Sequence, residues 1–229
     1  MRLLLISSSN VHGYGYLDHP EPEIRSFLGS GRRVAFVPFA AHDHATYTAK
    51  VRERLGRMEL GAVSLADLDH ADAIFVGGGN TFRLLKTLYE RDLLSPIRDR
   101  VRAGLPYLGS SAGTVIAAPT IKTTNDMPIV EPPSFDALGL VTFQINPHYL
   151  DPDPQSTHRG ETREERIREL LEENDTRVVG LREGSILRVE NGATALLGNK
   201  PARVFRRGHD PVEVDPGNGI DTILKGYPE

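Results

Sequence analysis

The sequence predicts an α/β protein with a mostly parallel sheet, helices on both faces of the sheet, and short antiparallel strands near the C-terminus. Two patterns support this prediction. Up to Ala118, short apolar runs alternate with loops and amphipathic segments, which is the pattern of strand–helix units in a parallel sheet. After residue 177, four short apolar segments follow one another through Gly and Asn turns, which is typical of antiparallel strands.

The first half of the chain contains five apolar runs that are expected to be buried strands. These runs lie at 3–7, 33–39, 62–65, 73–76 and 105–108. Helices are expected at 21–28, 46–60, 81–90 and 93–103, and the start of another at 114–118. In the helix expected at 46–60, one face is apolar because Tyr47, Val51, Leu55 and Met58 recur at three- and four-residue spacing.

The pattern changes after Ala118. Residues 120–134 are rich in Thr, Asn, Asp and Pro, which indicates a long loop or a short hairpin. A strand is expected at 141–145 and a helix at 162–173, followed by the strands at 178–181, 185–190, 193–197 and 202–206. Because the sequence contains no repeat, low-complexity segment or linker, we expect one domain over residues 1–229.

Composition narrows the classes of function. The chain has 229 residues, of which 25% are charged, and a net charge of −4, so no basic field attracts nucleic acid or anionic lipid. It has no cysteine, which excludes disulfides, thiolate metal sites and a cysteine nucleophile. No run reaches the ~20 apolar residues that cross a bilayer, and the N-terminal run is too short for a signal peptide. We therefore expect neither a nucleic acid nor a membrane as partner.

The pentapeptide Gly109–Ser110–Ser111–Ala112–Gly113 lies between an apolar run and a helix-like stretch. A G-x-S-x-G turn between a strand and a helix holds a serine hydroxyl where a base and an electrophile can both reach it. Glycines flank the bend because a side chain there would clash with the strand or block the substrate. The motif also occurs in ordinary loops, so it makes Ser111 a candidate nucleophile.

A serine nucleophile needs a base, and histidine is the usual one. Most of the eight histidines lie in polar, turn-like segments, but His148 follows an apolar run and so lies at the expected carboxyl end of a strand. Ser111 follows a strand too, and loops at the carboxyl ends of parallel strands line the binding crevice of open α/β sheets. His148 is therefore the candidate base, with a structural histidine as the alternative.

Two carboxylates are candidates for the group that orients this histidine. Glu183 follows the apolar run at 178–181, and Asp126 lies between Ser111 and His148 in the sequence. The order Ser111, Asp126, His148 is that of the α/β-hydrolases, but Asp126 also has the Asn-Asp surroundings of a turn residue. The spacing does not decide between the two carboxylates.

The segment Gly77–Gly78–Gly79–Asn80–Thr81 follows another apolar run. Three glycines let the backbone approach a bound group, and Asn80 or Thr81 can cap the helix that follows. Free N–H groups at this helix start suit an anion, either a phosphate or the oxyanion of a tetrahedral intermediate. The segment lacks the spacing of a P-loop or a dinucleotide site. A tight structural turn is the alternative.

Five separated segments in this order resemble peptidase E, the α-aspartyl dipeptidase family. They are 74–82, 109–113, 123–130, 144–148 and 160–170. The resemblance runs from the first strand to about Phe205. It implies a flavodoxin-like fold related to class I glutamine amidotransferases, with serine in place of their cysteine. It also implies a cytoplasmic enzyme that needs no metal or other cofactor and that cleaves dipeptides with an N-terminal aspartate.

The resemblance also implies roles for individual residues. Ser111 matches the nucleophile and His148 the general base, and both Glu183 and Asp126 match acidic positions of the family. Glu183 is favoured as the partner of the histidine because the amidotransferase relatives have that order. The amides of Gly79 and Ala112 would form the oxyanion hole. Thr114–Val115 departs from the Ala-Asn that is common in the family after the bend.

A substrate aspartate needs a cation, since a guanidinium can hold a carboxylate with two hydrogen bonds. Arg163 is the candidate, with Arg159 and Arg166 behind it, although an Arg- and Glu-rich helix is usually a solvated face. Asn80 and Thr81 are also expected to bind substrate. We expect a small peptide as the partner and a monomer or homodimer. The alternatives are a cyanophycinase-like hydrolase of β-aspartyl-arginine dipeptides and a non-catalytic protein that binds a small anion at residues 77–80.

Overall fold

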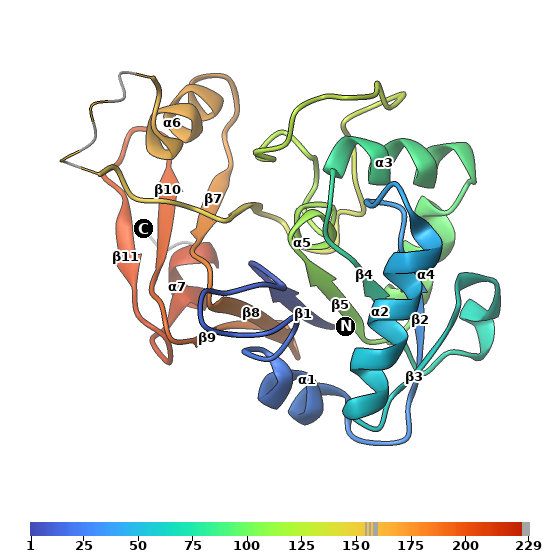
Figure 1. Cartoon of the computed structure of the whole chain (residues 1–229). Helices are drawn as coiled ribbons and strands as arrows, with labels where there is room; N and C mark the ends of the chain where they lie inside the picture. The colour runs from blue at the N-terminus through green and yellow to red at the C-terminus, as the bar shows by residue number, and fades with distance from the viewer. Residues whose placement is uncertain (154, 156, 158–159, 226–229) are drawn as a thin grey trace.

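Seven strands form the larger of two sheets, in the order β3-β2-β4-β5-β1-β8-β9 (Figure 1). The computed structural model describes residues 1–153, 155, 157 and 160–225. Five strands of this sheet are parallel: β1 (Arg2–Ile6), β2 (Arg33–Val37), β3 (Gly61–Ser64), β4 (Ala73–Val76) and β5 (Tyr107–Ser110). The strands β8 (Ser185–Glu190) and β9 (Ala193–Gly198) are antiparallel to their neighbours. The mostly parallel α/β fold is thus confirmed.

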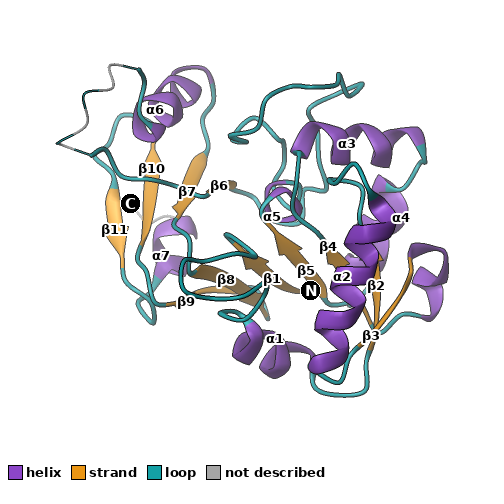
Figure 2. Cartoon of the chain, in the orientation of Figure 1, coloured by secondary structure: helices purple, strands orange, loops and turns teal. Residues whose placement is uncertain are grey.

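Helices cover both faces of the larger sheet (Figure 2). One face packs against α1 (Glu21–Leu28) and α2 (His44–Arg57), and the other against α3 (Thr81–Glu90), α4 (Leu94–Arg102) and the short α5 (Ala112–Val115). Alternation along a strand explains the two cores: Leu3 and Leu5 face α3 and α4, whereas Leu4 and Ile6 face α1 and α2. A 3₁₀ helix, η1 (Leu65–His70), connects β3 to β4.

A second sheet has the order β11-β10-β7-β6. Its strands are β6 (Gln144–Pro147), β7 (Arg177–Leu181), β10 (Ala202–Arg206) and β11 (Val212–Val214). The expectation that the strand at 178–181 is antiparallel is only half right, because β7 is antiparallel to β10 but parallel to β6. Helix α6 (Arg163–Glu173) packs on this sheet through Ile167 and Leu171, and a final helix, α7 (Ile220–Lys225), was not predicted.

The two sheets are held together where β1 ends. The larger apolar core includes residues from both sheets, such as Leu187 of β8 and Val179 of β7. Ser7, which follows β1, donates its hydroxyl to the Leu181 carbonyl at 2.7 Å and its amide to the Ser185 carbonyl at 3.2 Å. Figure 1 shows β7, β10 and β11 beside the β8–β9 side of the larger sheet, away from β2 and β3. Within the described residues, no helix combines the length and apolar character that crossing a bilayer requires.

Candidate active site

Ser111 lies in a sharp bend between β5 and α5. Its φ is 52°, in the left-handed region that a residue with a side chain rarely adopts. The bend is held by its neighbours: the Ser111 amide donates to the Ile6 carbonyl at 3.1 Å, and the Thr114 hydroxyl lies 2.7 Å from the same oxygen. Thr114, at a position where the sequence departs from the family that it resembles, is therefore buried and helps to hold the bend through its hydroxyl.

The glycines on both sides of Ser111 are required by close packing. A Cβ on Gly109 would overlap the Gly113 carbonyl, and a Cβ on Gly113 would overlap the Val76 carbonyl of β4. The Tyr107 hydroxyl donates to the Gly113 carbonyl at 2.5 Å from a fully buried ring. The predicted clash with the strand is thus present, and the serine is presented by a rigid backbone.

His148 and Glu183 reach Ser111 from the second sheet. The Ser111 Oγ lies 2.8 Å from His148 Nε2, and His148 Nδ1 lies 2.7 Å from Glu183 Oε1. His148 follows β6 and Glu183 lies just after β7. These strands are parallel neighbours, so their carboxyl ends lie at the same edge of the sheet and bring the two side chains together. An ionised carboxylate only accepts hydrogen bonds, so Nδ1 carries the proton and Nε2 of the neutral ring accepts from the serine hydroxyl.

The backbone of His148 is fixed independently of its ring. His148 has a φ of 54°, and its amide donates to the Ser7 hydroxyl at 3.0 Å. Ser7 in turn donates to the Leu181 carbonyl, two residues before Glu183. One buried serine of the larger sheet thus sets the positions of both loops that carry the imidazole and the carboxylate.

Asp126 does not contact His148. Its Oδ2 accepts from the Thr81 amide at 2.7 Å and from the Thr81 hydroxyl at 2.6 Å, at the first residue of α3. Asn80 is the N-cap of this helix, since its Oδ1 accepts from the Arg83 amide at 3.0 Å, and its Nδ2 donates to the Met127 carbonyl. The cap prediction for Asn80 is therefore confirmed, and Asp126 braces the helix start.

Neither Asn80 nor Thr81 lines the cavity beside Ser111. The Thr81 residue is only 1% exposed, and its hydroxyl is engaged by Asp126. The structure therefore does not support direct substrate contact by Thr81. The sequence indicated polar groups after β4, but it did not show which of their atoms would be occupied by hydrogen bonds at the start of α3.

Two backbone amides near Ser111 have no hydrogen-bond acceptor within the described residues. Among the described residues, neither the Gly79 N–H nor the Ala112 N–H donates a hydrogen bond, whereas the Gly78 N–H donates to the Tyr47 hydroxyl at 3.0 Å. Gly79 has a φ of 137°, and a Cβ there would overlap the Ala40 carbonyl. Of the predicted oxyanion donors, Gly79 thus lies in the loop after β4, and Ala112 is the first residue of α5, directly after the serine.

A cavity of about 310 Å³ opens beside the serine. It is lined by Ser8, Ser9, Asn10, Tyr16, Ala41, Tyr47, Lys50, Gly78, Gly79, Ser111 and His148. Sequence reasoning missed the polar wall formed by Tyr16, Tyr47 and Lys50. Tyr47 was assigned to an apolar helix face, and the only signal for Lys50 was its position one turn further along the same helix.

Arg163 lies elsewhere. It is the first residue of α6 and lines a separate cavity of about 410 Å³ with Leu150, Asp151, Pro152, Asp153, Gly160, Glu161, Thr162 and Arg166. Burial lowers the pKa of its guanidinium, and Arg166 adds to this effect. Arg159 lies outside the described residues. The structure therefore does not bring the predicted cation to Ser111.

Metal ligands are not gathered at this site. Within the part of the chain that the structure describes, no three His, Asp or Glu side chains lie together in an arrangement that could hold a metal ion. Ser111, His148 and Glu183 supply a hydroxyl, an imidazole and a carboxylate, and together with backbone amides these are the groups used in acyl transfer.

Comparison with known proteins agrees with this geometry. Residues 3–197 match the model of peptidase family S51. A peptidase E of Streptomyces coelicolor is 58% identical, with 98% of this chain and 95% of that protein covered. A Drosophila melanogaster protein named probable alpha-aspartyl dipeptidase is 49% identical, with 97% of each chain covered.

Solved structures support the same conclusion. The crystal structure of a protein assigned as peptidase E from Listeria monocytogenes EGD-e superposes with a TM-score of 0.66 at 25% identity, covering 86% of this chain and 98% of that one. A peptidase from an acI-B1 Actinobacterium shares the fold, with a TM-score of 0.67 at 17% identity and 95% of each chain covered. The bend at Ser111 and these matches agree, and the chain belongs to peptidase family S51 as a serine peptidase.

Proposed function

We propose that the protein is a dipeptidase that hydrolyses dipeptides with an N-terminal aspartate through an acyl-enzyme on Ser111. The observation that carries the proposal is the hydrogen-bonded series from Ser111 through His148 to Glu183. The name of the Drosophila relative, alpha-aspartyl dipeptidase, supports the choice of substrate. The cavity volume is at the low end of the ~300–1,000 Å³ of ligand pockets, in keeping with a short peptide.

In the proposed reaction, Ser111 Oγ attacks the peptide carbonyl carbon while His148 Nε2 takes its proton. The amides of Gly79 and Ala112 stabilise the oxyanion of the tetrahedral intermediate. The C–N bond then breaks, and His148 gives the proton to the leaving amine. A water molecule, deprotonated by the same nitrogen, then attacks the acyl carbon. The bond from this carbon to Ser111 Oγ breaks, His148 returns the proton to Oγ, and the N-terminal residue is released. Glu183 keeps the ring in the tautomer that accepts from serine and stabilises the imidazolium.

We assign the orienting role to Glu183 and a positioning role to Asp126. Glu183 is hydrogen-bonded to the imidazole, whereas Asp126 is hydrogen-bonded to the first residue of α3. That residue comes two positions after Gly79, so Asp126 would act by holding the oxyanion loop in place. Arg163 as a reader of the substrate carboxylate stays a prediction with no contact to the cavity of Ser111 to support it.

The test is hydrolysis of a panel of α- and β-aspartyl dipeptides by the wild type and by Ser111→Ala, with a chelator present. We expect cleavage of α-aspartyl peptides such as Asp-Leu and a loss of at least about 10⁴-fold in the variant. Cleavage of β-aspartyl-arginine alone would favour the cyanophycinase-like alternative. Binding of small anions without any turnover would favour the non-catalytic alternative. Activity lost on chelation would contradict the proposed chemistry.

We further propose that residues 1–229 form one domain that acts on free peptides in the cytoplasm, as a monomer or homodimer. The larger apolar core, which includes residues of both sheets, supports the single domain. The net charge of −4 supports the absence of a nucleic-acid partner. Thermal unfolding tests the single domain: we expect one cooperative transition, and independent melting of two parts would contradict it. The molar mass from light scattering tests whether the protein is a monomer or a homodimer.

A further inference from the structure

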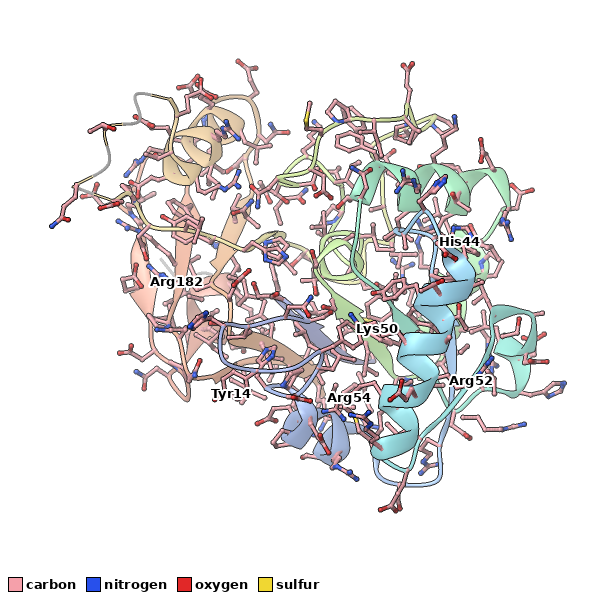
Figure 3. All side chains as sticks on the ribbon, viewed as in Figure 1. Tyr14, His44, Lys50, Arg52, Arg54 and Arg182 are labelled. Atoms are coloured by element: carbon pink, nitrogen blue, oxygen red, sulfur yellow. The ribbon has the colours of Figure 1, made fainter. Side chains whose placement is uncertain are left out.

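Lys50 brings a positive charge to the cavity of Ser111. Among the described residues, it is the only Lys or Arg that lines this cavity. Figure 3 shows Lys50 on the side of α2 that faces the loop after β1, and Arg52 on the opposite side of the same helix. Arg52 lines a different cavity with Phe39, Val63 and Leu93. Two cations of one helix thus face two different spaces, and only Lys50 faces the nucleophile.

The charge of Lys50 is not neutralised by the neighbouring carboxylates. Asp18 and Glu53 share an adjoining cavity with Lys50, but both are engaged by other cations. Asp18 lies 2.8 Å from the buried Arg54, and Glu53 pairs with Arg57 one turn along α2. Among the described residues, the Lys50 ammonium forms no ion pair with a carboxylate within 4 Å.

Two tyrosines connect Lys50 to the nucleophile. The Lys50 Nζ lies 4.1 Å from the centre of the Tyr16 ring, and the Tyr16 and Tyr47 hydroxyls are 3.3 Å apart. The Tyr47 hydroxyl accepts from the Gly78 amide, and a Cβ on Gly78 would lie 3.1 Å from the Ser111 Cβ. This series of contacts connects the cation to the backbone beside the serine.

The same tyrosines do not cancel the charge of Lys50. Burial raises the pKa of the Tyr16 phenol, and its neighbour Tyr47 raises it further. Burial also raises the pKa of Tyr47. Both phenols are therefore neutral near pH 7 and present a polar, uncharged wall. The wall is rigid, because the buried Arg54 donates to the carbonyls of Tyr16 and Leu17 at 2.8 and 3.0 Å.

We propose that the Lys50 ammonium binds a carboxylate of the dipeptide substrate. The inference rests on the proposed function of Ser111. A net cation in a cavity with no acidic lining residue attracts an anion, and the nucleophile acts on a peptide carbonyl in the same cavity. Two carboxylates of an aspartyl dipeptide meet this description: the side chain of the first residue and the C-terminus of the second.

The experiment is steady-state kinetics on Asp-Leu with the wild type, Lys50→Met, Lys50→Arg and the control Arg52→Met. Lys50→Met should raise KM about 10- to 100-fold, the loss expected for a hydrogen bond to a charged group, with little change in kcat. Lys50→Arg should recover most of the loss, because it restores the charge. Arg52→Met should behave as the wild type, and thermal unfolding should confirm that all three variants fold.

Two further substrates identify the carboxylate. Asp-Leu-amide lacks the C-terminal carboxylate, and Asn-Leu lacks the side-chain carboxylate. If Lys50 holds the side chain, Lys50→Met should affect Asp-Leu and Asp-Leu-amide equally and leave the weak hydrolysis of Asn-Leu unchanged. If Lys50 holds the C-terminus, Lys50→Met should affect Asp-Leu and Asn-Leu and leave Asp-Leu-amide unchanged.

Several results would overturn the inference. A KM of Lys50→Met equal to that of the wild type, or an equal loss on all three substrates, would exclude a carboxylate contact. A fall in kcat alone, without rescue by arginine, would indicate a purely structural role. A wild type that cleaves no aspartyl peptide would overturn the proposed function itself, and this inference with it. Turnover by the wild type with no effect of Lys50→Met would overturn only the inference.

Discussion

The two sheets contribute different parts of the site, and they hold them in different ways. In the larger sheet, Ser111 lies in a bend of consecutive residues between Gly109 and Gly113, and this bend packs against Val76 and is hydrogen-bonded to Ile6. In the smaller sheet, His148 and Glu183 are 35 residues apart in the chain and meet because β6 and β7 are parallel neighbours. The bend that carries the nucleophile is thus continuous in the sequence, whereas the base and its carboxylate come from separate segments that the strand topology brings together.

The two parts share the larger apolar core, and hydrogen bonds next to the site also join them. The segment 123–127 contacts both sides: Asp126 accepts from Thr81 at the start of α3, and Asn125 donates to the Pro147 carbonyl just before His148. Ser7 provides the other connection through the His148 amide. Variants of these residues test whether the two parts depend on each other.

The largest effect is expected where the parts meet in the reaction. Ser111→Ala and His148→Ala should each lower kcat by about 10⁴- to 10⁶-fold, and the double variant should be no worse than either, because the two residues act as a unit. Glu183→Gln should cost less, since it only orients and stabilises the ring. Stopped assays with excess enzyme measure these rates. Additive losses in the double variant would show that serine and histidine act separately.

A smaller effect is expected for Asp126, on the nucleophile side. Asp126→Asn should lower kcat about 10- to 100-fold, because the start of α3 loosens and the Gly79 amide is less well placed. Thr81→Val should have a similar effect, and the double variant should add nothing further. If Asp126→Asn instead matched Glu183→Gln and added to Thr81→Val, Asp126 would have a role at the imidazole and not at the helix start.

Ser7 tests the connection between the sheets. Ser7→Ala leaves the His148 amide without its acceptor and removes one of the donors to the Leu181 carbonyl, which keeps the Tyr149 amide. We therefore expect the free energy of unfolding to fall by about 2 kcal/mol, with a measurable loss of kcat. The control is Ser185→Ala, another fully buried serine, whose hydroxyl donates to the Lys200 carbonyl away from the imidazole. It should lose stability but keep kcat. Equal losses of kcat would remove the special role of Ser7.

The smallest effect concerns the free energy of unfolding at acid pH and the ion pair of Asp151 with Arg182 beside the smaller sheet. Two hydrogen bonds from Arg182, of 2.6 and 2.8 Å, hold the pKa of the Asp151 carboxyl below its usual value. This stabilisation is fully present above the unfolded value near pH 4 and is lost as pH falls through the lower folded pKa. Asp151→Asn should therefore cost less than about 1 kcal/mol at pH 7.

Urea titrations between pH 2 and pH 7 measure this contribution. The difference between Asp151→Asn and the wild type should shrink toward the acid end. Glu21→Gln is the matched variant in α1, which packs on the larger sheet, since hydrogen bonds from Arg54 and Arg25 lower the pKa of Glu21. It should show the same pH trend without altering kcat. A difference that grows as pH falls would contradict the assigned ion pairs.

Much of the fold was predictable because strands and helices depend on nearby residues. The helices at 21–28 and 81–90 and the strand at 73–76 have the expected bounds. The strand expected at 141–145 is displaced to β6 (Gln144–Pro147), and its membership in a second sheet was missed. Sheet membership depends on distant pairing partners, which hydrophobic periodicity does not encode.

The sequence by itself determined the bend at Ser111 and the alternation of strands and helices, because glycine positions and apolar spacing act over a few residues. Only the tertiary structure decided that Glu183, and not Asp126, is hydrogen-bonded to His148, and that Lys50, and not Arg163, lies in the cavity of the nucleophile. These pairings depend on which strand ends and helix faces become neighbours when the two sheets pack, and residues far apart in a chain carry no local signal of that contact.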